Sequence, residues 1–172
     1  MSNLYVRNIV RFLSLVLFQV LILNHMNLSG YINPYIYILF ILLLPARINK
    51  SMLLLFAFLT GLTIDYFGNT LGLHAATTVF MAFTRLSVIK VFFNNVEFLT
   101  GDEPGFAKIK AGGFLKYALV LVFIHHSALF ILEVFDFHEF LNTLSRIALS
   151  TLVTTAMIMI IMLVFTPVKR KN

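Results

Sequence analysis

The chain has 172 residues, of which 60% are hydrophobic and only 12% are charged, and its formal net charge is +6. This composition lies far outside that of a soluble globular domain, so we expect the chain to fold in lipid. The length suits one compact domain over residues 1–172, and the lack of cysteine excludes disulfides and thiol chemistry.

Six apolar segments follow one another, separated by glycine, proline, asparagine or charge. Four are close to the ~20 residues that a helix needs to cross a bilayer. The second and third are shorter, and they form either a re-entrant hairpin or two short crossings. Arg47 and Lys50 lie between them, and burying both charges would be costly, which favours two crossings. The sequence predicts an all-α bundle of about six transmembrane helices, at residues 5–23, 31–44, 51–64, 74–93, 114–132 and 147–165.

Lysine and arginine are concentrated in alternate connections. They precede the first segment, lie between the second and third, surround the fourth connection and close the chain, whereas the other connections hold only Arg146. Cytoplasmic loops of membrane proteins are enriched in these residues. The pattern predicts a multi-pass protein with both termini and residues 94–113 in the cytoplasm. It also accounts for the net charge without nucleic acid as a partner.

The stretch GLTIDYFGNTLGLHA, residues 61–75, joins the third and fourth segments. Gly61, Gly68 and Gly72 permit a sharp reversal of the chain and close backbone contact, and Asp65 is placed to accept backbone N–H groups there. We therefore expect a capped turn between two helices, flanked by Asp65 and His74. A role in docking a partner or binding a polar group stays open, because polar groups at membrane depth are costly to keep.

The fifth segment contains FIHHSALFILEVF. His126 and Glu133 are seven residues apart and share a helix face, whereas His125 is rotated by about 100° from His126. A metal site with the acidic and histidine residues of the loop 135–140 is conceivable, but the ligand spacings of known sites are missing. We expect hydrogen bonds or ion pairs between helices, with Arg146 as the partner of Glu133.

Two other segments carry residues that predict packing. Arg85 is expected to face inward or to extend toward the cytoplasmic end of its helix. Ala148, Thr151 and Thr155 recur at helical spacing and predict a narrow face on which another helix packs closely.

Enzyme motifs are missing from the sequence. It contains no nucleophile elbow, no H-E-x-x-H, no P-loop and no dinucleotide fingerprint. A lone aspartate in GLTID also lacks the second carboxylate that an aspartyl protease requires. We therefore expect a non-catalytic protein without a cofactor or metal.

The runs FQVLILNHMNLSGYINPYIYILFILLLP, GLTIDYFGNTLGLHAATTVFMAFTR and LKYALVLVFIHHSALFILEVF resemble the MreD family of rod shape-determining proteins, in its Bacteroidetes-type form. The resemblance extends from about residue 19 to the end, and is most specific in the G-x-x-x-D…G-L-H-A and IHH…E segments. The N-terminus and residues 94–113 depart from it. It implies an inner-membrane component of the bacterial elongation machinery, with a fold similar to the six-helix substrate-binding subunits of energy-coupling-factor transporters.

The resemblance also implies partners. These are MreC, a single-pass membrane protein that continues into the periplasm, and with it the MreB filament and the peptidoglycan synthases. The outward loop EVFDFHEF suits a contact with Phe135, Phe137 and Phe140 as apolar anchors and a charged rim. We expect His126 and Glu133 to contribute to the same surface.

Two functions therefore compete at the level of sequence. One is a membrane scaffold that binds MreC, and the other is a solute- or lipid-binding subunit of a transporter. An enclosed pocket lined by Asp65, His74 and His126 would favour the transporter subunit, whereas an apolar outer groove would favour the scaffold.

Overall fold

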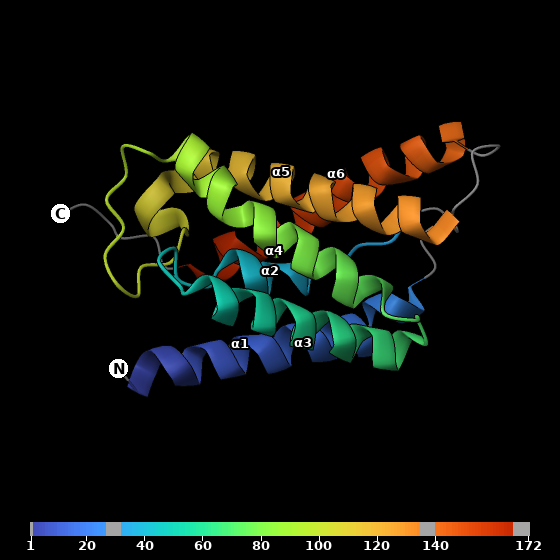
Figure 1. The fold of residues 1–172 in the computed structure, drawn as a ribbon, viewed down its shortest axis with the longest axis horizontal. Helices are drawn as coiled ribbons and strands as arrows, with labels where there is room; N and C mark the ends of the chain where they lie inside the picture. Colours follow the sequence, from blue (N-terminus) through green and yellow to red (C-terminus); the bar gives the residue numbers. More distant parts are fainter. Residues whose placement is uncertain (1, 27–31, 135–139, 167–172) are drawn as a thin grey trace.

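The computed structural model describes residues 2–26, 32–134 and 140–166, and this part of the chain is all-α (Figure 1). Five of its helices are long and apolar enough to span a membrane. The chain is thus a multi-pass helical membrane protein. The elements are α1, Ser2–Leu21; η1, a short 3-10 turn at Leu23–His25; α2, Ile38–Leu42; α3, Lys50–Gly68; α4, Leu73–Phe92; α5, Phe106–Val134; and α6, Phe140–Phe165.

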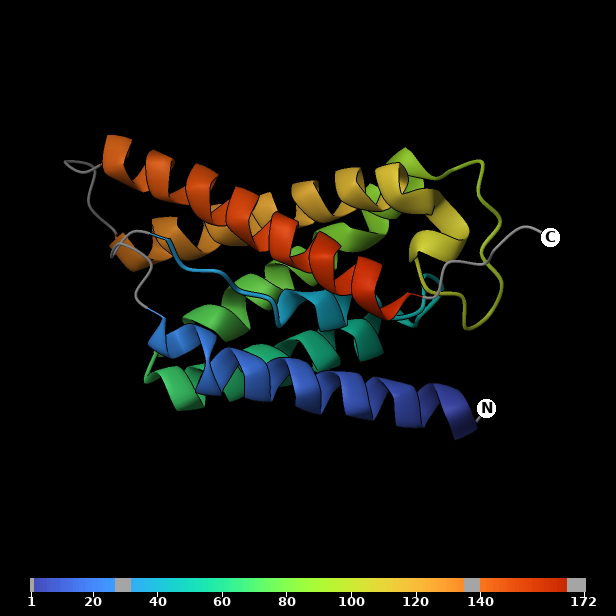
Figure 2. The ribbon, with the colours of Figure 1, turned by 180° about the vertical axis from the view of Figure 1, so that it is seen from behind.

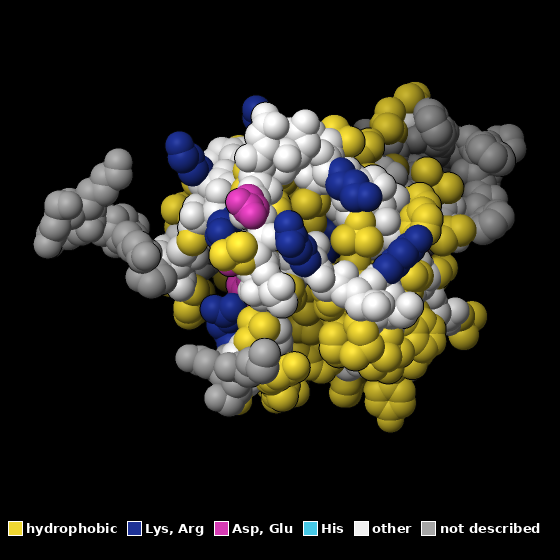
Figure 3. All heavy atoms as spheres, turned by 60° about the vertical axis from the view of Figure 1, so that its left-hand side comes forward, with side chains coloured by type: hydrophobic (Ala, Val, Ile, Leu, Met, Phe, Trp, Pro, Cys, Tyr) yellow, Lys and Arg dark blue, Asp and Glu magenta, His cyan; other side chains and the backbone are white. Residues whose placement is uncertain are grey.

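The long helices lie side by side, and the first and last helices have their chain ends at the same end of the molecule (Figures 1 and 2). The helices α1, α3 and α5 begin at this end, and α4 and α6 finish there. Lysine and arginine side chains are spread over it, as Figure 3 shows. We call it the basic end, and the other the opposite end. The helix directions agree with the predicted alternation of connections, while the side of the membrane that each end faces stays a prediction.

The second predicted span, residues 31–44, is not a transmembrane helix, so that prediction is wrong. Residues 32–35 are not helical, and Ile38–Leu42 form little more than one helical turn. The segment still leads from the opposite end to the basic end (Figure 1). Pro34 is a local reason, because proline has no N–H and disfavours helical geometry in the preceding residue. An extended chain rises about 3.3 Å per residue against about 1.5 Å in a helix, so a short segment covers the distance.

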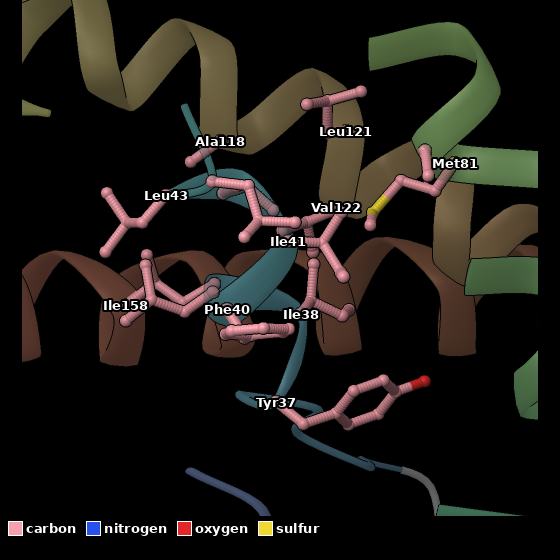
Figure 4. Close-up of a cluster of buried hydrophobic side chains, with 14 of the residues drawn as sticks. Tyr37, Ile38, Phe40, Ile41, Leu43, Met81, Ala118, Leu121, Val122 and Ile158 are labelled. Carbon is pink, nitrogen blue, oxygen red and sulfur yellow. The ribbon is translucent and has the colours of Figure 1, made fainter. Parts of the chain in front are cut away.

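The helix α2 lies at the centre of the bundle. All five of its residues are buried, and Ile38, Ile41 and Leu42 are completely so. The outer faces of the long helices expose large apolar side chains, as contact with lipid requires. The core is therefore built around a discontinuous segment. Figure 4 shows the side chains of three helices that pack on it, namely Met81 of α4, Ala118, Leu121 and Val122 of α5, and Ile158 of α6.

The other predicted spans correspond to long helices, of which α4 matches its predicted length and α3, α5 and α6 are clearly longer than predicted. The helix α3 continues past residue 64 to Gly68, and α6 begins at Phe140 instead of residue 147. The helix α5 begins at Phe106 and is kinked at Lys110, where φ is 56° and ψ is 170°. The predicted spans stopped where the sequence becomes polar, but side-chain contacts hold those polar residues within the helices.

Candidate functional site

The backbone of the segment that precedes α2 depends on a glutamine of α1. Gln19 is 1% exposed. Its Nε2 donates to the carbonyl oxygen of Pro34 at 3.1 Å, and its Oε1 accepts from the N–H of Ile36 at 2.9 Å. Lipid offers no partners to free backbone groups. One amide side chain therefore satisfies a donor and an acceptor of the non-helical backbone.

Two hydroxyl groups of α6 also accept hydrogen bonds from the backbone of this segment. Ser150 Oγ accepts from the N–H of Asn33 at 3.1 Å, and Thr154 Oγ1 accepts from the N–H of Tyr35 at 3.2 Å. Ser150 and Thr154 are both completely buried. Their spacing of four residues places them on one face of α6, which matches the spacing of the two N–H groups along the chain.

The carbonyl groups at the end of α2 are satisfied by a buried arginine. Arg85 of α4 is completely buried, and its guanidinium donates to the carbonyl oxygens of Leu42, at 3.3 Å, and Leu44. Its Nε also donates to the hydroxyl of Tyr117 at 2.8 Å, and that hydroxyl donates to Leu42 O at 2.9 Å. A helix end leaves carbonyls unpaired and partly negative, so a cation is stabilising there. Of the two positions that the sequence predicted for Arg85, it takes the inward one.

The side chains of one tyrosine and two histidines meet between the contacts that hold the segment before α2 and the contacts of Arg85 at the end of α2. The hydroxyl of Tyr37 lies 3.0 Å from His74 Nδ1 and 2.8 Å from His125 Nε2. All three side chains are buried. The hydroxyl has one proton, so it donates to one imidazole at most, and the other imidazole donates to it. If the hydroxyl donates to one imidazole, two neutral imidazoles carry their protons on the same nitrogen, either both on Nε2 or both on Nδ1. The hydroxyl also lies 3.3 Å from Thr78 Oγ1, which can accept its proton instead.

The second nitrogen of His125 decides between these two arrangements. Among the described residues, His125 Nδ1 is buried without a hydrogen-bond partner. A buried N–H without an acceptor is rarer in proteins than an unpaired acceptor. The geometry therefore favours Nε2–H on His125, with His125 donating to Tyr37 and Tyr37 donating to His74 or Thr78. This chain of hydrogen bonds joins α4, α5 and the segment before α2.

His126 is buried on the face of α5 that packs on α6. Its Nδ1 lies 2.9 Å from the carbonyl oxygen of Val122, which only accepts, so Nδ1 is the donor. Its Nε2 lies 3.3 Å from Thr154 Oγ1 and accepts from that hydroxyl. The same hydroxyl oxygen accepts from Tyr35, so His126 orients the group that holds the segment before α2.

Glu133 and Arg146 form the ion pair that the sequence predicted, with 3.2 Å between Arg146 Nη1 and Glu133 Oε2. Glu133 turns toward α6, as His126 does, so the predicted shared face is confirmed. Within the described residues, no three histidine, aspartate or glutamate side chains are grouped as metal ligands. Phe135, Phe137 and the polar residues 136, 138 and 139 lie outside the described residues.

Asp65 caps the turn between α3 and α4. Its two carboxylate oxygens accept from the N–H groups of His74, at 3.0 Å, and Ala75, at 2.8 Å. The hydroxyl of Thr70 donates to the same carboxylate. These are the backbone contacts that the sequence predicted for this residue. A carboxylate at a helix N-terminus also interacts favourably with the helix dipole.

The glycines of this region have different roles. Gly72 has φ of 86° and Asn69 has φ of 52°, so these two residues make the reversal. Gly68 is the last helical residue of α3, and the prediction that it permits the reversal is wrong. Gly61 instead marks a close approach of two helices, because a Cβ added there would lie 2.5 Å from Ala75 Cα.

The predicted packing face of α6 is partly wrong. Thr151 and Thr155 are buried, but Ala148 is exposed. The buried face also includes Ser150 and Thr154, which contact the segment before α2. Because that segment lies between helices, the packing face of α6 is polar and broader than the sequence indicated.

Two cavities in the described part of the chain bear on the alternatives of scaffold and transporter subunit. One, of about 310 Å³, is near the opposite end and is lined by polar side chains that include Gln19, Asn24 and His74. The other, of about 680 Å³, is a mostly apolar groove at the basic end, between α1 and α6. Asp65 and His126 line neither cavity. Neither of these two cavities is therefore the enclosed pocket lined by Asp65, His74 and His126 that would have favoured the transporter subunit.

The sequence missed the residues that hold the segment before α2. Gln19 and Tyr37 are side chains with a polar group in apolar runs, and Ser150 and Thr154 each lie beside a threonine in such a run. Such residues in membrane helices usually face the protein interior, and that signal could have identified them. Comparisons of this chain with family models, with curated proteins and with solved structures found no match.

Proposed function

We propose that this protein is a non-catalytic scaffold of the cell-elongation machinery in a bacterial cytoplasmic membrane, with both termini in the cytoplasm. Its direct partner would be an MreC-like single-pass protein, acting with the MreB filament and the peptidoglycan synthases. The partner assignment rests on the sequence resemblance to the MreD family.

One structural observation carries the scaffold role. Seven buried polar side chains bind one another or nearby backbone groups, namely Gln19, Tyr37, His74, Arg85, Tyr117, His126 and Thr154. Hydrogen bonds between buried side chains of different helices favour one arrangement of those helices. A fixed bundle presents a constant outer surface, which is what a docking protein needs.

The partner surface is placed at the opposite end of α5 and α6. The Glu133–Arg146 pair ties these two helices together there, and the Arg146 guanidinium lies 4.3 Å above the Phe130 ring. The connection between them carries Phe135 and Phe137. Aromatic anchors within a charged rim are typical of residues that dominate binding energy.

Copurification from mild detergent tests this assignment. Changing Phe135 and Phe137 together to alanine is expected to release the MreC-like partner while the protein stays inserted and abundant. The matched control is Phe80→Ala with Phe83→Ala, since both side chains are about half exposed on α4, at 52% and 54%. Retention of the partner by the first variant, and its loss when residues 94–105 are altered, would place the interface at the basic end.

A second candidate is the solute-binding subunit of a transporter, favoured by the polar cavity of about 310 Å³ that reaches His74. Such a subunit would copurify with a small polar solute, and changing Asn24 and His74 to alanine would release it. Mass spectrometry of the denatured, purified protein separates the two functions. A stoichiometric solute supports the transporter subunit, and a stoichiometric MreC-like protein supports the scaffold.

A further inference from the structure

The apolar groove at the basic end lies between α1 and α6. The helix α1 packs on α2 and α3, and α6 packs on α5 and, through Ile158, also on α2. Leu39 and Leu43 at α2 line the groove between them, with Met162 of α6 and Leu15 of α1. All four side chains are buried. The groove has a volume of about 680 Å³, and in a membrane it is open to acyl chains.

Charged side chains line the basic end of the groove. Arg7 and Arg11 both bind the single carboxylate of Glu103, with nitrogen–oxygen distances of 2.7 Å and 3.0 Å. Lys108 pairs with Asp102 at 2.7 Å, and this hydrogen bond holds the pKa of the Asp102 carboxyl below its ordinary value. Asp102 therefore stays ionised at neutral pH and balances Lys108. Two guanidinium groups on one carboxylate leave a surplus positive charge.

We propose that this groove binds one anionic phospholipid, with an acyl chain along Leu39, Leu43 and Met162 and the phosphate against Arg7 and Arg11. Arginine presents donors in a fork that matches phosphate geometry. Basic pockets between membrane helices on the cytoplasmic side are known to hold anionic headgroups. Arg7 is half exposed, at 52% of its side chain, so its guanidinium is accessible to a headgroup.

The size of the groove favours a lipid over a helix of a partner protein. A helix with its side chains is about 10–12 Å across, so about 680 Å³ holds only between one and two turns of helix. An acyl chain is much thinner and fits a narrow apolar groove. The proposal does not depend on the cellular role, because the lipid contacts this chain alone.

The lack of tryptophan allows a direct test. Phe165 lines the groove, and Phe165→Trp places a single fluorophore there. The protein is reconstituted in phosphatidylcholine vesicles that contain either brominated phosphatidylglycerol or brominated phosphatidylcholine at the same mole fraction. Because bromine quenches only on contact, we expect quenching by the anionic lipid to be at least about twofold stronger. Equal quenching by the two lipids would overturn the proposal.

Matched variants distinguish a specific lipid-binding site from a general attraction of anionic lipids to the basic end. At Phe83→Trp, a lipid-facing position of α4 beside Lys50, the two lipids should quench equally. A preference of the same size there would show general attraction and contradict a site. In the Phe165→Trp background, Arg7→Gln should reduce the preference and Glu103→Gln should increase it, whereas Lys90→Gln should leave it unchanged. If neither Arg7→Gln nor Glu103→Gln changes the stronger quenching by the anionic lipid, the proposal is also contradicted.

Discussion

Arg85 shows how a charge is accommodated in the middle of this bundle. It has backbone carbonyl groups and a tyrosine hydroxyl as partners, so its charge stabilises the end of a helix that has only five residues. The arginine and the short helix depend on each other. In sequence, Arg85 is a single cation in an apolar run, and nothing in that run indicates which carbonyl groups it will reach.

Replacing Arg85 by methionine is expected to destabilise the protein strongly. The change leaves the carbonyl groups of Leu42 and Leu44 without this donor in an apolar environment, which costs about 3 kcal/mol. For a chain of this length, each 1 kcal/mol lowers the melting temperature by about 2–4 °C. Thermal unfolding in detergent measures the change. Lys90→Met, an exposed position on the same helix, should have little effect, and equal effects of the two variants would contradict the assigned role.

Asp65 gives a graded prediction. Asp65→Leu removes every acceptor from the first turn of α4 and should cost about 2 kcal/mol, within the range for losing a helix cap. Asp65→Asn retains one carbonyl oxygen for the N–H groups of His74 and Ala75 and should cost about half as much. Unfolding midpoints of the two purified variants measure the order. If both fall equally far, the charge of Asp65 and not its acceptor geometry is what the turn requires.

At the scale of elements, the close crossing of α3 and α4 depends on one glycine. A Cβ at residue 61 would lie 2.5 Å from the backbone of Ala75, so Gly61→Ala must push the two helices apart. We expect a loss of about 1–3 kcal/mol from overpacking. Gly68→Ala is the matched control, because its Cβ would meet only a side-chain atom of Thr70 at 3.5 Å. Comparable loss of thermal stability in both variants would show that the crossing tolerates a methyl group.

The long helices could be predicted from the sequence, and the discontinuous segment could not. Residues 5–23 and 74–93 are apolar over the length of a membrane span, and length alone identified them. Residues 31–44 are equally apolar, but hydropathy does not distinguish a short helix from an extended chain. Their structure depends on Gln19 and Thr154, which are distant in sequence. The Glu133–Arg146 pair was predictable because the two opposite charges lie at neighbouring helix ends, where each has few other charged partners.

At the scale of the whole molecule, we propose that the discontinuous segment crosses the membrane and returns the chain to the basic end. If only the five long helices crossed the membrane, the odd number of crossings would leave the two termini on opposite sides of it. With the segment as an additional crossing, both termini lie on the same side, which agrees with the placement of the basic residues over one end (Figure 3). The crossing therefore decides the topology of every later helix.

Cysteine labelling on intact cells tests this claim most directly, because the chain has no cysteine of its own. Single cysteines are placed at His25 and Asn49, which flank the segment, and at Asn69 and Asn94, and all four positions are exposed. An impermeant thiol reagent should label residues 25 and 69 from outside, and residues 49 and 94 only after the cells are opened. Labelling of residues 25 and 49 from the same side would show that the segment does not cross, and would contradict the topology.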